Sequence, residues 1–240
     1  MFQIKDFNPR PYQVAISNQA SNNNTLVVLP TGLGKTKIAI LTTVNRLNNI
    51  ENSKVLICTP TKPLSAQIHK EFINNTDIPE QRISLLTGHL KPDKRKQLWD
   101  LSYIIIATPQ TIQKDIENNR INLENVSLLV LDECHKSRDN YATTKLADNL
   151  MKISKFHRIL ALTASPGSTK EKIDQICKNL FIEKVEIRTE DDEDIKEFIQ
   201  EKEIKWMEVD LPVELKELHK KIKKVYLERV PSLRNFGLTK

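Results

Sequence analysis

The residues whose types and spacing point most directly to chemistry lie in the segment Thr25 to Thr36, TLVVLPTGLGKT. Its glycines, Gly32 and Gly34, let successive backbone N–H groups converge on phosphate oxygens, and the helix expected to follow adds partial positive charge at its N-terminus. Lys35 then reaches the β- and γ-phosphates, and the Thr36 hydroxyl takes a place on Mg²⁺. In the empty site we expect Lys35 to face solvent. The predicted nucleotide-binding residues of this loop are Thr31, Gly32, Leu33, Gly34, Lys35 and Thr36.

The loop departs from the general phosphate-loop pattern at one position. That pattern has glycine five residues before Gly34, where this chain has Leu29, so the sequence fits the variant Pro-Thr-Gly-x-Gly-Lys-Thr. A chance Gly-Lys-Thr at the end of a strand is the alternative. The order of strand, glycine loop, Lys-Thr and amphipathic helix favours phosphate binding over that alternative.

A second candidate group is the acidic pair Asp132 and Glu133, which directly follows the apolar run Ser127 to Leu131. We predict that Asp132 holds Mg²⁺ through water, opposite Thr36, and that Glu133 orients and deprotonates the attacking water. A helix N-cap is the alternative for an acidic pair at a strand end. Together with Lys35, the pair makes up the predicted catalytic set.

The two residues after the pair, Cys134 and His135, have different expected roles. His135 belongs to no metal-binding pattern, so we expect a hydrogen-bonding relay toward Thr163 or Ser165. Cys134 has no activating base nearby in the sequence and is expected to be structural. These residues therefore extend the site without adding a second metal or a nucleophile.

Short apolar runs alternate with amphipathic helices along the chain, which predicts an α/β fold with a doubly wound, mostly parallel sheet. The runs expected as strands are Leu26 to Leu29, Lys54 to Thr59, Arg82 to Leu86, Tyr103 to Ala107, Ser127 to Leu131, Arg158 to Leu162 and Lys184 to Arg188. Five of them end in a polar motif: the phosphate loop, PTKP, TPQT, DECH and TASPG. Because ligands bind beyond the carboxyl ends of parallel strands, all five motifs are expected at one edge.

Two other segments contain several lysines and belong to none of these five motifs. The cluster Lys91 to Lys96 is interpreted as a solvated helix face, with a phosphate-contacting patch as the alternative. Toward the end, Glu203 to Asp210 is a possible strand, and Pro212 opens a helix. Its residues expected to point inward are Leu215, Leu218, Ile222 and Val225. We therefore predict a first domain over 1–203 and the start of an incomplete helical second domain over 204–240.

Composition narrows the class of protein. The 240 residues carry a net charge of +6, which weakly favours a polyanionic partner. The three cysteines form no close pair in the sequence, so we expect no disulfide framework. We expect the protein to reside in a reducing compartment. The N-terminus is no signal peptide, and no apolar run approaches membrane-spanning length.

The motif set PTGLGKT, PTKPL, ATPQT, DECH and LTASPGST resembles the N-terminal motor domain of superfamily-two helicases. More narrowly, it is similar to the archaeal Hef helicase–nucleases and the eukaryotic Fanconi anaemia M-type helicases. The resemblance implies a RecA-like fold, ATP and Mg²⁺ as cofactors, and a motor that tracks along a single strand of branched or forked DNA. It also implies a second RecA-like domain in the full-length chain, with an inserted helical domain after the first.

The resemblance also assigns individual residues. It assigns Gln13 to adenine; a glutamine amide can both donate to and accept from that base, although taken alone Gln13 is an ordinary surface residue. The residues assigned to the sugar–phosphate backbone are Thr61, Lys62, Gly88, Thr108, Gln110 and Thr111. Thr163 and Ser165, with His135, are assigned to the coupling of hydrolysis to strand movement.

Three functions stay open at this point. The first is a DNA helicase or translocase, placed in the cytoplasm with the nucleoid if archaeal or in the nucleus if eukaryotic. The second is a double-stranded-RNA-stimulated ATPase, because DECH replaces the Hef-like DEAH and also occurs in RNA-sensing helicases. The third is a nucleic-acid-binding module without turnover. No motif among these residues supplies an arginine finger, so this segment alone is expected to bind ATP weakly and turn it over slowly.

Overall fold

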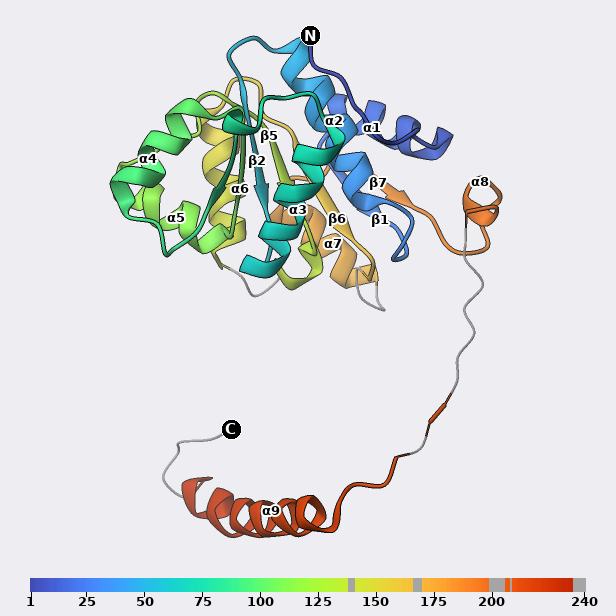
Figure 1. Cartoon of the computed structure of the whole chain (residues 1–240), viewed down its shortest axis with the longest axis vertical. Helices are drawn as coiled ribbons and strands as arrows, with labels where there is room; N and C mark the ends of the chain where they lie inside the picture. The colour runs from blue at the N-terminus through green and yellow to red at the C-terminus, as the bar shows by residue number, and fades with distance from the viewer. Residues whose placement is uncertain (138–140, 166–169, 199–205, 208, 235–240) are drawn as a thin grey trace. The chain divides into compact units, whose positions relative to one another are not determined.

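A seven-stranded sheet runs through the first of two units into which the chain divides, Met1–Ile199 (Figure 1). The computed structural model describes residues 1–137, 141–165, 170–198, 206–207 and 209–234. All strand pairings in the sheet are parallel, and the strand order is β3-β4-β2-β5-β6-β1-β7. The predicted doubly wound parallel sheet is therefore confirmed.

The strands form where the apolar runs predict them. They are β1 (Thr25–Val28), β2 (Lys54–Cys58), β3 (Ile83–Leu86), β4 (Ile104–Ala107), β5 (Val126–Leu131), β6 (Ile159–Thr163) and β7 (Lys184–Ile187). Every residue of β1, β4, β5 and β6 is buried, because helices cover both faces of the sheet. This two-sided burial explains why the strands are continuous apolar runs with no polar alternation.

Helices cover the two faces in two groups. One face packs against α1 (Pro11–Asn22), α2 (Lys35–Asn49) and α3 (Lys62–Asn75). The other packs against α4 (Pro92–Leu101), α5 (Pro109–Glu117), α6 (Tyr141–Ile153) and α7 (Lys170–Asn179). Neighbouring residues of one strand enter opposite cores: Val27 packs with the first group of helices, and Leu26 and Val28 with the second. Short elements complete the unit: the 3₁₀ turns η1 (Glu80–Arg82) and η2 (Cys134–Ser137), and α8 (Glu193–Lys196), whose Ile195 is buried.

The strand order divides the carboxyl edge of the sheet into two halves. In one half, β6 lies between β5 and β1, so the loops that follow these three strands are neighbours. In the other half, β4 lies between β3 and β2. The predicted nucleotide-binding motifs follow strands of the first half, and the predicted nucleic-acid-binding motifs follow strands of the second.

The second unit, Gln200–Lys240, contains the helix α9 (Val213–Arg234). The prediction that its apolar residues point inward is not met within this unit. Leu215, Leu218, Ile222 and Val225 are 49–60% exposed. The physical reason is that α9 is the one helix among the described residues of this unit, so the apolar face of the helix has no partner element within the unit.

Two other predictions concern the segment between α8 and α9. The domain boundary predicted after residue 203 lies among residues 199–205, which are outside the described residues. In the predicted strand Glu203 to Asp210, the described residues 206, 207, 209 and 210 have no regular structure. Among the described helices of the whole chain, none is long and apolar enough to cross a membrane.

Candidate functional site

A cleft of about 350 Å³ opens at the carboxyl edge of the β5–β6–β1 half of the sheet. It is lined by Thr31, Gly32, Gly34, Lys35, Thr36, Lys37, Leu64, Gln67, Glu71, Asp132 and Glu133. The loop that follows β1 and the acidic pair that follows β5 therefore meet in one cleft, although the segment between Thr36 and Asp132, which includes β2, β3 and β4, separates them in sequence. Lys35 and Asp132 thus line the same cleft.

The two glycines of the loop are required by its backbone. Gly32 and Gly34 have φ angles of +85° and +79°, in the left-handed region that L-residues with a side chain rarely adopt. Gly34 also caps the N-terminus of α2. A Cβ atom at Gly34 would lie 2.4 Å from the Nε2 atom of Gln13, so a side chain there would force the Gln13 amide out of its position.

Lys35 is half-buried in this structure, contrary to the expectation that it faces solvent. Its ammonium donates to the Leu29 carbonyl at 2.9 Å and to the Pro30 carbonyl at 3.3 Å. Burial lowers the pKa of Lys35, and the negative charges of Glu133 and Asp132 partly offset that effect. The correction has a simple cause: carbonyl groups at the end of β1 are the nearest acceptors for an ammonium inside the cleft.

Gln13 is a buried side chain, 3% exposed, and not the surface residue that its type alone indicates. Its Nε2 donates to the Leu33 carbonyl at 3.2 Å, and its Oε1 accepts from the Arg10 backbone N–H at 3.0 Å. The Tyr12 hydroxyl donates to the same Leu33 carbonyl at 2.7 Å. Two side chains of α1 therefore hydrogen-bond to the phosphate loop. Sequence reasoning did not select Tyr12 as one of them. Adenine recognition by Gln13 stays a prediction.

The acidic pair continues into a hydrogen-bonded chain of residues. Glu133 has a φ of +52°, a left-handed conformation that costs on the order of 1–3 kcal/mol for a residue of this type. Its Oε2 lies 3.3 Å from the His135 Nδ1, which in turn lies 2.8 Å from the Thr163 hydroxyl. The Ser165 backbone N–H donates to the same hydroxyl at 3.1 Å. The contacts expected of His135 are present; residues 166–169 of the TASPG segment lie outside the described residues.

Cys134 is completely buried between these residues. Burial and the charges of Asp132 and Glu133 raise the pKa of its thiol, which removes the thiolate that reactivity requires. The structural role predicted for Cys134 agrees with this environment. Among the described residues, no group of three or more metal-ligating side chains is present.

The residues assigned to a nucleic-acid backbone lie on the other half of the same edge. Thr61 caps α3, with its hydroxyl accepting from the Leu64 N–H at 3.4 Å. Lys62 is exposed, and its ammonium lies 3.0 Å from the His89 Nε2 in the turn that contains Gly88. His89 is a further exposed polar residue at this surface that the sequence analysis did not select, because a lone histidine after a glycine has no distinctive spacing.

The TPQT segment forms the N-terminus of α5. Thr108 is the N-cap residue, but its hydroxyl forms a hydrogen bond with the Thr111 hydroxyl at 3.0 Å and does not cap the backbone. Gln110 is exposed beside them. Since β3, β4 and β2 are adjacent, Gly88, Thr108 and Thr61 follow three neighbouring strands, about 4.8 Å apart from one strand to the next.

Residues of α3 also line the nucleotide-site cleft, and sequence reasoning missed them. Leu64, Gln67 and Glu71 reach it from one face of this helix. Glu71 forms a salt bridge of 3.1 Å with Lys37, which also donates to Asn75 at 2.6 Å. No sequence signal links these residues, because the contact joins α2 to α3 through tertiary packing alone.

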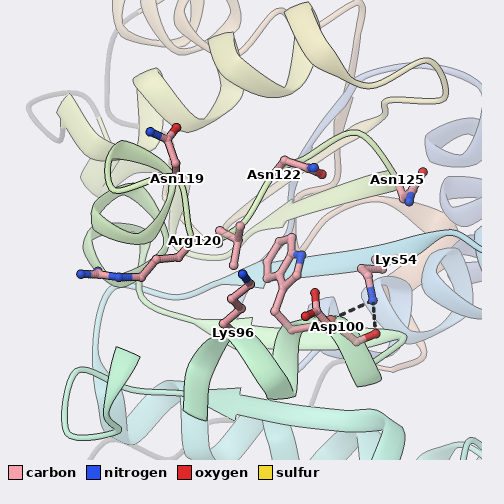
Figure 2. Close-up of a pocket in the computed structure, with 9 residues that line it drawn as sticks. Lys54, Lys96, Asp100, Asn119, Arg120, Asn122 and Asn125 are labelled. Carbon is pink, nitrogen blue, oxygen red and sulfur yellow. Dashed lines mark hydrogen bonds between the residues drawn. The ribbon is translucent and has the colours of Figure 1, made fainter. Parts of the chain in front are cut away.

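A second cleft, of about 510 Å³, lies near the amino ends of β2 and β5 (Figure 2). Lys54 lines it, but its ammonium donates to the carbonyls of Trp99, Asp100 and Ser102 at 2.8, 3.1 and 2.8 Å. These carbonyls are the last ones of α4, which have no partner within the helix. The lysine therefore completes a helix terminus, and the cleft is separate from the predicted nucleotide site.

Comparisons with known proteins agree with this geometry. The model of the family described as DEAD/DEAH box helicase matches residues 10–173. A putative ATP-dependent RNA helicase of Methanocaldococcus jannaschii is 42% identical over 99% of this chain and 30% of its own length. The ATP-dependent DNA helicase MPH1 of Pyricularia oryzae is 38% identical over 96% of this chain and 22% of its own length.

The crystal structure of the Pyrococcus furiosus Hef helicase domain superposes with a TM-score of 0.79 at 40% sequence identity. The superposition covers 96% of this chain and 48% of the Hef chain. It confirms the RecA-like α/β fold that the resemblance implied. This chain therefore spans less than a third of the length of these two curated relatives and about half of the length of the Hef chain.

Proposed function

This chain belongs to the DEAD/DEAH box helicase family, and we propose that it is the N-terminal ATP-binding domain of an ATP-dependent DNA helicase or translocase that acts on branched or forked DNA. One observation carries the proposal. The phosphate loop after β1 and the acidic pair after β5 line one cleft, and the segments at Thr61, Gly88 and Thr108 follow neighbouring strands of the same sheet edge. A nucleotide and a nucleic-acid strand would thus bind side by side on one surface.

The residues of the cleft fit a nucleoside triphosphate. Backbone N–H groups around the positive-φ glycines converge at the N-terminus of α2, and the Lys35 ammonium already binds two carbonyl oxygens that phosphate oxygens can replace. Thr36 and Asp132 offer hard oxygen ligands, the type that Mg²⁺ prefers, and would hold the ion between them. When bound, Mg²⁺ neutralises charge on the transferring phosphoryl group.

The remaining residues have roles in water activation and coupling. Glu133 would orient and deprotonate a water molecule. Its neighbour His135 contacts Thr163, so a change in the position of the Glu133 carboxylate reaches the loop at Ser165 through hydrogen bonds. This route would carry the state of the nucleotide to the surface where Thr163 and Ser165 couple hydrolysis to movement.

The nucleic acid is proposed to be DNA, because the MPH1 and fml1 relatives are named DNA helicases. The partner domain is a second RecA-like domain elsewhere in the full-length chain, since the similar Hef helicase domain is about twice as long as this chain. Such a protein would act where DNA is stored, in the nucleoid-containing cytoplasm or in the nucleus. A double-stranded-RNA-stimulated ATPase is the second candidate, favoured by the tetrad DECH and by the RNA-helicase name of the M. jannaschii relative.

An ATPase assay on the full-length protein separates these functions. We expect turnover to rise most with forked DNA, less with duplex RNA and least without nucleic acid. Stimulation by duplex RNA alone would replace the first candidate with the second, and equal rates in all three conditions would contradict both.

The variant Glu133→Gln tests the proposed base in the same assay. It should lower turnover by about 10²–10⁴-fold while ATP binding is retained. Full turnover in this variant would contradict the role of Glu133, and absence of turnover in the unmodified protein would favour a binding module.

A further inference from the structure

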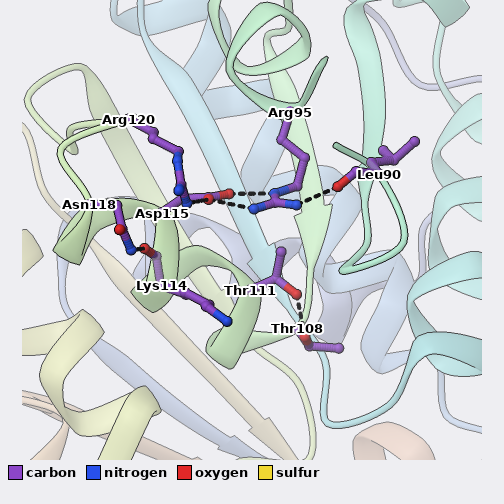
Figure 3. A network of polar contacts seen from close by, with 8 residues as sticks. All are labelled: Leu90, Arg95, Thr108, Thr111, Lys114, Asp115, Asn118 and Arg120. Atoms are coloured by element: carbon purple, nitrogen blue, oxygen red, sulfur yellow. Dashed lines mark hydrogen bonds and ion pairs between the residues drawn. The ribbon is translucent and has the colours of Figure 1, made fainter. Parts of the chain in front are cut away.

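A buried charge cluster joins the two loops that are assigned to the nucleic-acid backbone (Figure 3). Arg95 on α4 donates to both carboxylate oxygens of Asp115 on α5, each at 2.6 Å. Arg120, just beyond α5, donates to the same carboxylate at 3.1 Å. The Arg95 and Asp115 side chains are 7% and 1% exposed, so this ion pair is inside the protein. The interpretation of Lys91 to Lys96 as a solvated face is therefore wrong at Arg95, although Lys91, Lys94 and Lys96 are exposed.

Arg95 also binds a third acceptor, and that acceptor belongs to the first of the two loops. Its Nη1 donates to the Leu90 carbonyl at 2.5 Å. Leu90 closes the turn that contains Gly88, through its backbone N–H bond to the Thr87 carbonyl at 3.1 Å. A single guanidinium thus holds the Gly88 turn.

Asp115 belongs to the element that carries the second loop. It lies one helical turn beyond Thr111, and α5 is a rigid helix from Pro109 to Glu117. Because Arg95 binds Asp115 with two donors in a fixed plane, the guanidinium sets both the distance and the orientation of α5 relative to the Gly88 turn. The pairing of Leu86 with Ala107 places the ends of β3 and β4 side by side, but hydrogen bonds within the sheet do not reach the loops beyond them.

We infer that Arg95 is a positioning residue for nucleic-acid binding. It joins the Gly88 turn to α5 through Asp115, so that Gly88 and the residues Thr108 and Thr111 at the N-terminus of this helix form one surface for consecutive phosphates of a strand. The inference rests on the proposed function, because it concerns the same nucleic-acid-binding edge. Arg95 itself is buried and touches no nucleic acid; it acts through Leu90 and Asp115.

The variant Arg95→Lys tests the inference in the full-length protein. Lysine keeps the positive charge beside Asp115 but lacks the planar fork that reaches two carboxylate oxygens and the Leu90 carbonyl together. The concentration of forked DNA that gives half-maximal ATPase stimulation should rise roughly three- to thirty-fold, the size of effect that residues without a ligand contact can have on a binding site. The KM for ATP and the rate without DNA should stay within about twofold of the unmodified protein, because the nucleotide cleft is on the other half of the edge.

Two controls exclude simpler explanations. Lys96→Met removes an exposed cation from the neighbouring position of α4; an equal loss of DNA affinity in this variant would show that the charge of α4 matters and would overturn the inference. Ser154→Ala removes a buried hydroxyl that donates to the Val126 carbonyl at 2.7 Å, near the amino end of β5. If this variant loses DNA affinity as Arg95→Lys does, general destabilisation is the cause and the inference fails.

A second variant keeps the test decisive if Arg95→Lys does not fold. The double variant Arg95→Met with Asp115→Leu replaces the buried pair with apolar side chains of similar size, an exchange that buried ion pairs often tolerate. We expect a folded protein with the same loss of DNA affinity, because the bond to Leu90 is gone. Unchanged DNA affinity in a folded double variant would overturn the inference. An unmodified protein that no nucleic acid stimulates would instead overturn the proposed function.

Discussion

Side chains of the nucleotide site are fixed by hydrogen bonds to backbone carbonyls of the same chain. The Lys35 ammonium binds the carbonyls of Leu29 and Pro30, and Gln13 binds the Leu33 carbonyl from α1. The Lys35 ammonium can also bind a phosphate, and the Gln13 amide can also bind a base. Because hydrogen bonds within the chain already fix both side chains, the loop is ordered before a ligand binds. This arrangement lowers the ordering cost of binding.

The first prediction at this scale concerns Lys35→Ala. The variant should lose nucleotide affinity by roughly tenfold to more than a hundredfold, because a charge-assisted hydrogen bond to phosphate contributes about 1.5–3 kcal/mol. The fold should be retained, with the free energy of unfolding changed by less than about 1 kcal/mol. Isothermal titration calorimetry with ATP and thermal unfolding measure the two quantities.

The sign of the stability effect follows from the lowered pKa of Lys35. Burial destabilises the charged ammonium in the folded protein. Below the folded-state and unfolded-state pKa values of Lys35, this charge lowers the free energy of unfolding, and the alanine variant lacks that penalty. The unmodified protein should therefore gain stability relative to Lys35→Ala as the pH rises toward 10.5. If the unmodified protein instead lost stability relative to Lys35→Ala over that pH range, the lowered pKa of Lys35 would be contradicted.

The second prediction compares two glycines. Gly34→Ala should destabilise the protein by about 1–2 kcal/mol or more, because its φ is +79° and the new Cβ would meet Gln13 at 2.4 Å. Gly88→Ala is the matched control, since nothing lies within 4 Å of a Cβ built there. Its effect should stay within about 0.5 kcal/mol in the same thermal unfolding experiment. Equal effects of the two substitutions would refute the close approach of α1 to the loop.

At the scale of elements, the helices are positioned by polar contacts as well as by the apolar cores. Lys54 completes the end of α4, and Arg46 of α2 donates to the carbonyls of Ser21, Ser127 and Phe156. Arg95 and Asp115 join α4 to α5. Such contacts fix how a helix lies along the sheet, which apolar packing determines less sharply because it is not directional.

The third prediction concerns the acid stability of the α4–α5 contact. Burial alone would raise the pKa of the Asp115 carboxyl, but hydrogen bonds and the positive charges of Arg95 and Arg120 outweigh it and lower the pKa below 3.8. A lowered carboxyl pKa means that the stabilisation is present above 3.8 and is lost as the pH falls toward the folded-state value. Asp115→Asn should therefore lower stability at neutral pH and make unfolding less dependent on pH between about pH 5 and 2.

Urea unfolding of Asp115→Asn and of the unmodified protein at several pH values measures this difference. Lys152 and Asp148 form an exposed ion pair on α6, so Asp148→Asn serves as the control and should change stability by less than about 1 kcal/mol at every pH. Parallel stability curves for Asp115→Asn and the unmodified protein would contradict the buried ion pair.

At the scale of the whole molecule, the two units differ in how they are stabilised. Both hydrophobic cores are made of residues from the unit Met1–Ile199, from Tyr12 to Ile195. In the second unit, the apolar residues of α9 are exposed. A helix of this kind gains little from tertiary packing, which is the main source of helical stability in proteins.

The fourth prediction follows from this difference between the units. A chain that ends at Ile199 should fold with a thermal midpoint within about 2–4 °C of the full 240 residues, a shift that corresponds to about 1 kcal/mol for a domain of this size. Differential scanning calorimetry measures both midpoints, and circular dichroism should show the loss of one helix. A much lower midpoint for the shorter chain would show that α9 supports the sheet.

The sequence by itself determined the elements and their chemistry. Apolar runs predicted the seven strands to within one residue at each end. Six of the strands are mostly buried, and strands buried on both faces are continuous apolar runs; β7 is mostly exposed. The motifs that contain Gly34, Asp132 and Thr108 could be placed at strand ends because each motif begins directly after an apolar run. Parallel topology then put them at one edge.

Only the tertiary structure decided which of these motifs are neighbours and what supports them. Strand order is set by packing between distant segments, so the placement of β6 between β5 and β1 has no local signal. The same holds for the burial of Gln13, for the carbonyl partners of Lys35 and for the pairing of Arg95 with Asp115. Each depends on a partner that is distant in sequence or on the path of the folded backbone. Residue type records the capacity for such a contact, and the fold decides whether a partner is within reach.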